Sequence, residues 1–236
     1  MPATLPTHPL AVLPLKLWRP RWFDGVALAV GATAPDIAYA AGDAVVIRSH
    51  TVAAAFWWGL PVTVLTAWLI RLGAPMVAAH LPGALREYGA LRKVRHRWWV
   101  TATSALLGDA SHLLWDLVTH PGAIGSWRLV RDVSDYAALL LLPLFMVYVG
   151  RRHLIREWHG AAPVVQCRPL LFWSVAVEVF AAGAFVTAGL SYGGPHVFVV
   201  RLIVSAMIAL LMACLALHCV RAPGDRPVVA AAVPRG

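Results

Sequence analysis

Long apolar runs constrain this chain more than any other feature of its sequence. A helix that crosses the hydrocarbon core of a bilayer needs about 20 mainly apolar residues. Four runs approach or exceed that length, and two shorter ones accompany them, so that the candidate spans are residues 25–42, 52–71, 98–118, 135–150, 169–191 and 197–220. Only 13% of the residues are charged, about half the share in soluble domains. The sequence predicts an all-α, polytopic transmembrane bundle with about six spans.

The distribution of basic residues predicts how such a bundle is oriented. Sixteen of the 20 Lys and Arg residues lie before residue 25, in the loops 71–97 and 151–168, or after residue 220. Positive loops remain on the cytoplasmic side of a membrane, which places these loops and the C-terminus in the cytoplasm. No linker divides the chain, so we expect one membrane-embedded domain over residues 1–220, followed by a disordered cytoplasmic tail, 221–236.

The net charge of +9 would favour nucleic-acid binding in a soluble protein. Here the positive residues lie between apolar runs, where membrane topology explains them, and we expect no nucleic-acid partner. Membrane lipids are the expected partners, and the sequence names no protein partner. The three cysteines form no CxxC pair, so no disulfide framework is predicted.

The segment GDASHLLWDLVTHPG, residues 108–122, concentrates ionisable side chains near the end of an apolar run. Asp109, His112, Asp116 and His120 follow one another at intervals of three, four and four residues. At about 100° per residue they fall within an arc of roughly 80° on one helix face. Each ionisable group placed in hydrocarbon costs about 2.5–3.5 kcal/mol on insertion scales. Such a stripe must therefore face a polar cavity, or other polar groups that hold the helices together.

Two further polar residues are expected near the same membrane face. Asp36 lies in GATAPDIAYA and His50 lies in RSHT, just before the next apolar run. Imidazole and carboxylate ligands together suit a divalent metal, zinc or manganese, or a pair of metals. Each residue alone is better explained as an ordinary loop or interfacial residue.

His8 can join this group only if the N-terminal segment is re-entrant. A simple topology would leave His8 on the cytoplasmic side. If residues 8–18 enter the membrane from the outer face as a helix, they descend about 15 Å, and residues 25–36 climb back about 16 Å. His8 and Asp36 would then lie at nearly the same depth. Pro9 and Pro14 make that segment irregular, which requires shielding by protein or water.

Arg201 lies inside the last apolar run, near the level of the His and Asp residues, where it could neutralise Asp109, hold an anionic substrate or serve as a structural counter-ion. His80, His96, His153 and His159 lie among basic residues in predicted cytoplasmic loops, and we expect them to be solvated. The sequence contains no GxSxG elbow, P-loop, HExxH or dinucleotide-binding fingerprint.

Several of these segments together resemble a known family. The segments THPLAVLPL, ATAPDIAY, SHT and GDASHLLWDLVTH resemble an uncharacterised bacterial family of integral membrane proteins, described as a domain of unknown function. That family is similar to membrane-bound proteins described as metal-dependent hydrolases. The resemblance covers most of residues 1–160 and implies, as site residues, His8, Asp36, His50, His112, Asp116 and, more loosely, His120. It also implies the bacterial inner membrane as the location.

Three functional hypotheses follow. The first is a metal-dependent hydrolase, with zinc as the expected cofactor, that acts on an ester or phosphoester of a lipid or lipid-linked substrate at the outer leaflet. Asp109 is then the candidate general base and Arg201 the candidate group that stabilises negative charge. The second is an ion or proton transport protein, in which the polar stripe forms a pathway. The third is a noncatalytic membrane scaffold with a structural polar core.

Overall fold

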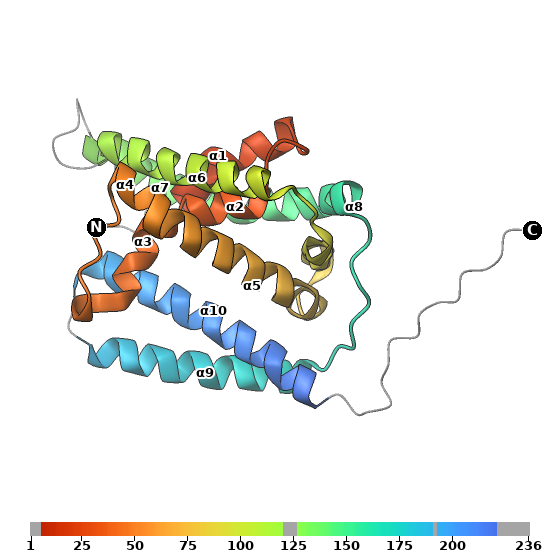
Figure 1. Cartoon of the computed structure of the whole chain (residues 1–236). Coiled ribbons are helices and arrows are strands. Elements are labelled where there is room, and N and C mark those ends of the chain that lie inside the picture. Colours follow the sequence, from red (N-terminus) through yellow and green to blue (C-terminus); the bar gives the residue numbers. More distant parts are fainter. Residues whose placement is uncertain (1–5, 120–126, 191–192, 221–236) are drawn as a thin grey trace, which may run out of the picture.

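The computed structural model describes residues 6–119, 127–190 and 193–220, and these residues form helices and loops without a strand. Figure 1 shows the long helices running alongside one another, with α3 and α4 at one end of the bundle and α8 at the other. His120 and the predicted tail, residues 221–236, lie outside the described residues.

The elements are mostly long helices joined by short helical turns. In chain order they are α1 Thr7–Trp18, α2 Gly25–Gly31, α3 Ala34–Ile37, the 3-10 segment η1 Ala38–Ala44, α4 Val52–Ala54, the π-helical turn η2 Ala55–Gly59, α5 Leu60–Ala79, the 3-10 segment η3 Gly83–Lys93, α6 Trp98–Thr119, α7 Trp127–Arg151, α8 Leu154–His159, α9 Pro169–Gly189 and α10 Pro195–Cys219.

Four helices are long and apolar enough to cross a membrane: Val52–Ala79, Leu129–Arg151, Pro169–Gly189 and Pro195–Cys219. They suggest a membrane protein, in agreement with the sequence. The predicted run 25–42 does not form one helix, because α2 ends at Gly31 and the separate short helix α3 begins at Ala34, with Pro35 in its first turn. Proline has no N–H to continue an earlier helix and restricts the residue before it. The count of six spans is therefore not confirmed.

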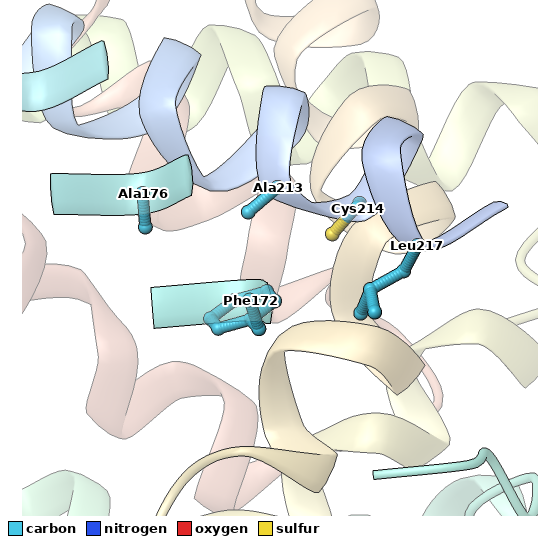
Figure 2. Close-up of a cluster of buried hydrophobic side chains, with 5 residues drawn as sticks. All are labelled: Phe172, Ala176, Ala213, Cys214 and Leu217. Atoms are coloured by element: carbon cyan, nitrogen blue, oxygen red, sulfur yellow. The ribbon is translucent and has the colours of Figure 1, made fainter. Parts of the chain in front are cut away.

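The last two helices form an antiparallel pair that packs against α5. Figure 2 shows the buried cluster of Phe172 and Ala176 from α9 with Ala213, Cys214 and Leu217 from α10. Met76 and Val77 of α5 pack against this cluster. The small residues of this cluster, Ala176 and Ala213, allow the two backbones to approach closely, which is the usual way that helices associate in a membrane.

A tighter contact joins α2 to α6. A Cβ atom added to Gly108 of α6 would lie 2.5 Å from the Leu28 carbonyl oxygen and 2.7 Å from the Ala32 nitrogen. On the other side, a Cβ atom on Gly31 would collide with the carbonyl of Ala105. Glycine at these two positions lets the two backbones touch, and this contact fixes where α2 and the following α3 lie along α6.

Asp24 fastens one end of this contact. Its side chain caps α2 by accepting a hydrogen bond from the Ala27 nitrogen, accepts another from the Thr101 hydroxyl of α6, and forms an ion pair with Arg71 of α5. Its backbone nitrogen donates to the Ser104 hydroxyl. Burial alone would raise the pKa of Asp24, but Arg71 and these hydrogen bonds hold that pKa below its ordinary value. Asp24 therefore joins α2, α5 and α6 as a carboxylate.

The contact of α2 with α6 makes Gly108 intolerant of a side chain. We expect Gly108→Ala to lower the free energy of unfolding by about 1–3 kcal/mol, the usual cost of overpacking, because its methyl group meets backbone atoms that cannot move aside. The thermal midpoint of the detergent-purified chain measures the effect. Gly189→Ala is the control, since a Cβ atom there meets nothing within 4 Å. Equal midpoints for the two variants would contradict the close contact.

Candidate metal centre

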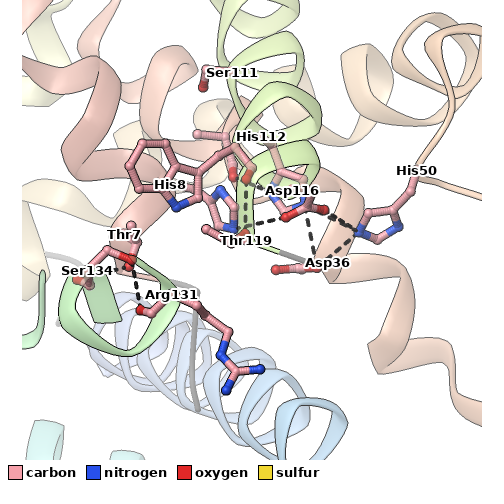
Figure 3. A network of polar contacts seen from close by, with 12 residues as sticks. Thr7, His8, Asp36, His50, Ser111, His112, Asp116, Thr119, Arg131 and Ser134 are labelled. Carbon is pink, nitrogen blue, oxygen red and sulfur yellow. Dashed lines mark hydrogen bonds and ion pairs between the residues drawn. The ribbon is translucent and has the colours of Figure 1, made fainter. Parts of the chain in front are cut away.

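Five of the predicted site residues lie together at one end of α6. They come from separate segments: His8 from the first turn of α1, Asp36 from α3, His50 from the loop before α4, and His112 and Asp116 from α6. Figure 3 shows their side chains directed toward one another. Two sets of three, His8 with Asp36 and His112, and His50 with His112 and Asp116, each offer ligand atoms within 4.8 Å of one another.

The Nε2 atom of His112 lies at the centre of the group. It is 3.3 Å from Nε2 of His50 and 3.3 Å from Oδ2 of Asp116. Asp36 Oδ1 lies 3.7 Å from the same nitrogen and 3.3 Å from Nε2 of His50. Two imidazole nitrogens and two carboxylate oxygens therefore surround one small space.

The backbone of α2 determines which nitrogen of His112 faces that space. Nδ1 of His112 lies 2.9 Å from the carbonyl oxygen of Ala32. Because a carbonyl can only accept, Nδ1 must carry the proton and donate it. In the neutral ring Nε2 then keeps its lone pair and presents it to the other four side chains. A histidine that ligates a metal is commonly oriented in this way by a backbone carbonyl.

His8 lies against the ring of His112 and is almost completely buried. The two imidazoles stack with their ring centroids 3.9 Å apart, and Nε2 of His8 is 3.8 Å from Oδ1 of Asp116. The stacking therefore brings a second imidazole to the carboxylate of Asp116, beside the space that Nε2 of His112 faces.

The donor set and its spacing fit a divalent cation. Zinc binds histidine nitrogen and carboxylate oxygen at about 2.0–2.2 Å, and tetrahedral ligands at such distances stand about 3.3 Å apart. The contacts among His50, His112, Asp36 and Asp116 range from 3.3 to 3.8 Å. These side chains could hold a cation with little rearrangement. His8 lies close enough to Asp36 and His112 to take the place of one of the four ligands.

Local structure holds each outer ligand in place. The Thr7 hydroxyl next to His8 donates to Asp135 of α7 at 3.1 Å. The Thr51 hydroxyl after His50 caps α4 by accepting from the Ala54 nitrogen. Asp36 lies in the single turn of α3, directly after Pro35. The Trp58 indole donates to the Ala34 carbonyl at 3.0 Å and so ties α3 to the π-helical turn.

Asp109 and Arg201, predicted as catalytic residues, occupy different surroundings. Asp109 is buried one turn before His112 and faces Gly59, the last residue of the π-helical turn. Neither of its carboxyl oxygens has a hydrogen-bond partner among the described residues. Arg201 is buried on α10, a helix that packs against α3 and η1.

The sequence did not predict three groups that lie near the centre, namely the side chains of Tyr39 and Ser49 and the carbonyl of Ala32. Tyr39 lies with its ring centroid 5.6 Å from that of His50 and 5.1 Å from that of His196. Its spacing of three residues from Asp36 was a usable signal, because residues three apart share a helix face. The hydroxyl of Ser49 lies 3.1 Å from Nδ1 of His50. Neither this hydroxyl nor the carbonyl of Ala32 had a signal in the sequence.

A family model for a domain of unknown function, DUF4184, matches residues 1–218. The chain belongs to the DUF4184 family. The matched region contains every predicted site residue, and the resemblance to a domain of unknown function is confirmed. No curated protein and no solved structure matches this DUF4184 chain, so its similarity to metal-dependent hydrolases stays a prediction.

The buried carboxyl of Asp109 in this DUF4184 protein contrasts with that of Asp24. We expect Asp109→Asn to change the free energy of unfolding by less than about 1 kcal/mol, because the substitution breaks no hydrogen bond. Asp24→Asn should cost about 3–5 kcal/mol, since it leaves Arg71 as a charge without its partner. Thermal unfolding of the two variants side by side measures this difference. A large loss for Asp109→Asn would show that Asp109 is a structural group instead.

Proposed function

We propose that this protein is a membrane-embedded, metal-dependent hydrolase that acts on an ester or phosphoester of a lipid or lipid-linked substrate. The observation that supports it is the convergence of three imidazoles and two carboxylates from four separate chain segments. Burying such a group is costly unless a cation or hydrogen bonds compensate. A divalent cation compensates the two carboxylates and uses the nitrogen lone pairs at the same time.

In this proposal His50, His112, Asp36 and Asp116 hold the cation, and His8 supplies an additional ligand. The bound cation would acidify water and withdraw charge from a substrate oxygen. Zinc is the expected metal, because neutral imidazole and carboxylate are ligands that it accepts. The carbonyl of Ala32 keeps the donor nitrogen of His112 directed at the centre.

Asp109 and Arg201 complete the proposed site. The carboxyl of Asp109 is buried without a hydrogen-bond partner among the described residues, which suits a group that takes up a proton during a reaction. Arg201 would stabilise negative charge on the substrate, as a guanidinium does for carboxylate or phosphate oxygens. Both roles are inferred from where the two side chains lie and from the chemistry of a carboxyl and a guanidinium group.

The membrane arrangement also enters the proposal. We infer that α6, and α2 together with α3 and η1, lie in the membrane beside the four apolar helices to give six crossings, and that α1 is re-entrant. In support, His8 at the start of α1 meets Asp36 after α2, although the chain between them extends away to Lys16. The basic segments η3 and α8 lie at the opposite end of the bundle (Figure 1). With that end in the cytoplasm of a bacterial inner membrane, the centre faces the outer leaflet.

Metal content tests this proposal first. The detergent-purified chain, prepared without chelator, should contain close to one equivalent of zinc or another divalent metal by elemental mass spectrometry. His112→Ala and Asp116→Ala should each reduce that content at least tenfold, since each variant removes a donor from the centre. His153→Ala is the matched control, because this exposed histidine pairs with Glu87 away from the centre.

Each outcome of that measurement has a definite meaning. Wild-type protein that binds no metal even after supplementation would overturn the hydrolase proposal and favour the structural polar core. Metal that binds and also crosses the membrane in proteoliposomes would favour transport.

The second test concerns catalysis. In a screen of phosphatidic acid, lipid diphosphates and acyl esters, the metal-loaded chain should hydrolyse one class. Asp109→Asn should then lower kcat at least a hundredfold, the usual contribution of a general base, while metal content stays unchanged. Full activity in Asp109→Asn would remove Asp109 from the mechanism, and metal-loaded protein inactive on every substrate would argue against hydrolysis.

A further inference from the structure

A cavity lies between α1, α2, α7 and α8, and its lining extends along α1 from Pro9, the residue after His8, to Lys16. Its volume is about 340 Å³, within the range of about 300–1,000 Å³ of small-molecule sites. Its walls are almost entirely apolar and include Leu13 of α1, Val26 and Ala29 of α2, Leu142 and Phe145 of α7, and Trp158 of α8. Such a space suits a flexible hydrocarbon chain.

The polar residues of this cavity are Lys16, Asp24, His96 and His159. Lys16 lies eight residues after His8, which corresponds to about 12 Å along α1. The cavity therefore has a polar region of its own, away from the metal centre. This polar region and the apolar walls together match a molecule with a long chain and one polar head.

Lys16 is buried but forms no ion pair within the described part of the chain. Its ammonium group donates to the carbonyl oxygens of Pro20 and Phe23, at 2.7 and 2.9 Å, and lies 3.3 Å from Nε2 of His96. The ring of Trp158 faces it at 5.1 Å. These partners are neutral, so they stabilise the ammonium group without cancelling its charge.

The nearest carboxylate does not cancel that charge either. Asp24 forms its ion pair with Arg71 and accepts hydrogen bonds from Thr101 and Ala27. One carboxylate thus faces two cations, Arg71 and Lys16, and a positive charge is left over at the wall of an apolar cavity. An uncompensated charge in such surroundings is costly, and an anionic ligand would relieve that cost.

The two histidines of this cavity are uncharged at pH 7, so the positive charge of its polar region belongs to Lys16. Burial, followed by the neighbouring charge of Lys16, lowers the pKa of His159 to about 4 and also lowers the pKa of His96. Both rings are then neutral at pH 7. Two carbonyl oxygens and the nearby carboxylate of Asp24 favour the ammonium form of Lys16. The expected solvation of His96 and His159 is wrong, since both are partly buried beside Lys16.

We propose that this cavity binds a fatty carboxylate, with the hydrocarbon chain between α2 and α7 and the carboxylate head beside Lys16, His96 and His159. The N–H groups of Lys16 already contact the carbonyls of Pro20 and Phe23 and the ring of His96, so Lys16 attracts the carboxylate by its charge and the neutral imidazole N–H groups supply the hydrogen bonds. The site is independent of any metal bound at the other end of α6. The fatty carboxylate is therefore a second ligand of this protein and is not the substrate of the metal centre.

Equilibrium binding of tritiated hexadecanoate to the immobilised, detergent-purified full chain tests this site. We expect saturable binding of one molecule per chain. Unlabelled hexadecanoate should compete at least tenfold more strongly than hexadecanol, which has the same chain without the charge. Equal competition by the alcohol would overturn the proposal, because it would reduce binding to partition into an apolar space.

Two variants locate the site. Ala29→Phe fills the cavity from α2 and should weaken hexadecanoate binding at least tenfold. Val177→Phe adds the same ring on the exposed face of α9 and should bind as the wild type does. Unchanged binding by Ala29→Phe would overturn the assignment, and if that variant does not fold, the comparison of acid with alcohol on wild-type protein decides.

Removal of metal separates this site from the proposed function. Hexadecanoate binding should be the same before and after treatment with a chelator, since no residue of the metal centre lines the cavity. Loss of binding on chelation would place the fatty acid at the His and Asp residues instead, and would overturn the second site. Absence of metal from the protein would leave the hexadecanoate result unaffected.

Discussion

The contact between α2 and α6 is the constraint on which both ends of this molecule depend. Gly31 and Gly108 bring the two backbones together, and the register that results sets two groups of polar residues. At one end the Asp24 side chain reaches Thr101, and at the other the Ala32 carbonyl reaches His112. Thr101 and His112 are eleven residues apart on α6, about 16 Å as helix. A shift of α2 by one residue would misalign both ends together.

The two ends handle buried charge differently. Around Asp24, each acceptor oxygen meets a donor, and the ion pair with Arg71 is surrounded by hydrogen bonds. That arrangement stabilises the fold without any ligand. At the other end, when the imidazole of His112 is neutral, the lone pair on its Nε2 atom faces the Nε2 atom of His50 and two carboxylates, so acceptors meet acceptors. A cluster of that composition is suited to a cation, whereas the network around Asp24 needs none.

Much of the centre followed from the sequence because helix periodicity is local. Asp109, His112 and Asp116 share a face of α6 through their spacing alone, and the cost of placing them in hydrocarbon predicted polar neighbours. The approach of His8 to Asp36 was predicted only on the condition that the N-terminal segment is re-entrant, from the lengths of residues 8–18 and 25–36. The break in the run 25–42 had a local signal in Gly31 and Pro35, but apolar composition alone predicted one span. Tyr39 was missed although its spacing of three residues from Asp36 was a usable signal, and Ser49 was missed because a single hydroxyl side chain carries no periodic signal.

By itself, the sequence determined the class of the protein, its apolar helices and the residue types available for a metal centre. These depend on hydrophobicity and on spacing within one helix, which act over a few residues. Only the tertiary structure decided that the imidazoles of His8 and His112 stack, that Ala32 orients His112, and that Lys16 lies buried beside His96 and His159 in an apolar cavity. Those relations join residues that are far apart in the chain: His8 and His112 are separated by 104 positions, and Lys16 and His159 by 143. They arise from the packing of helices, whose register depends on contacts such as Gly108 against Leu28 that no local pattern encodes.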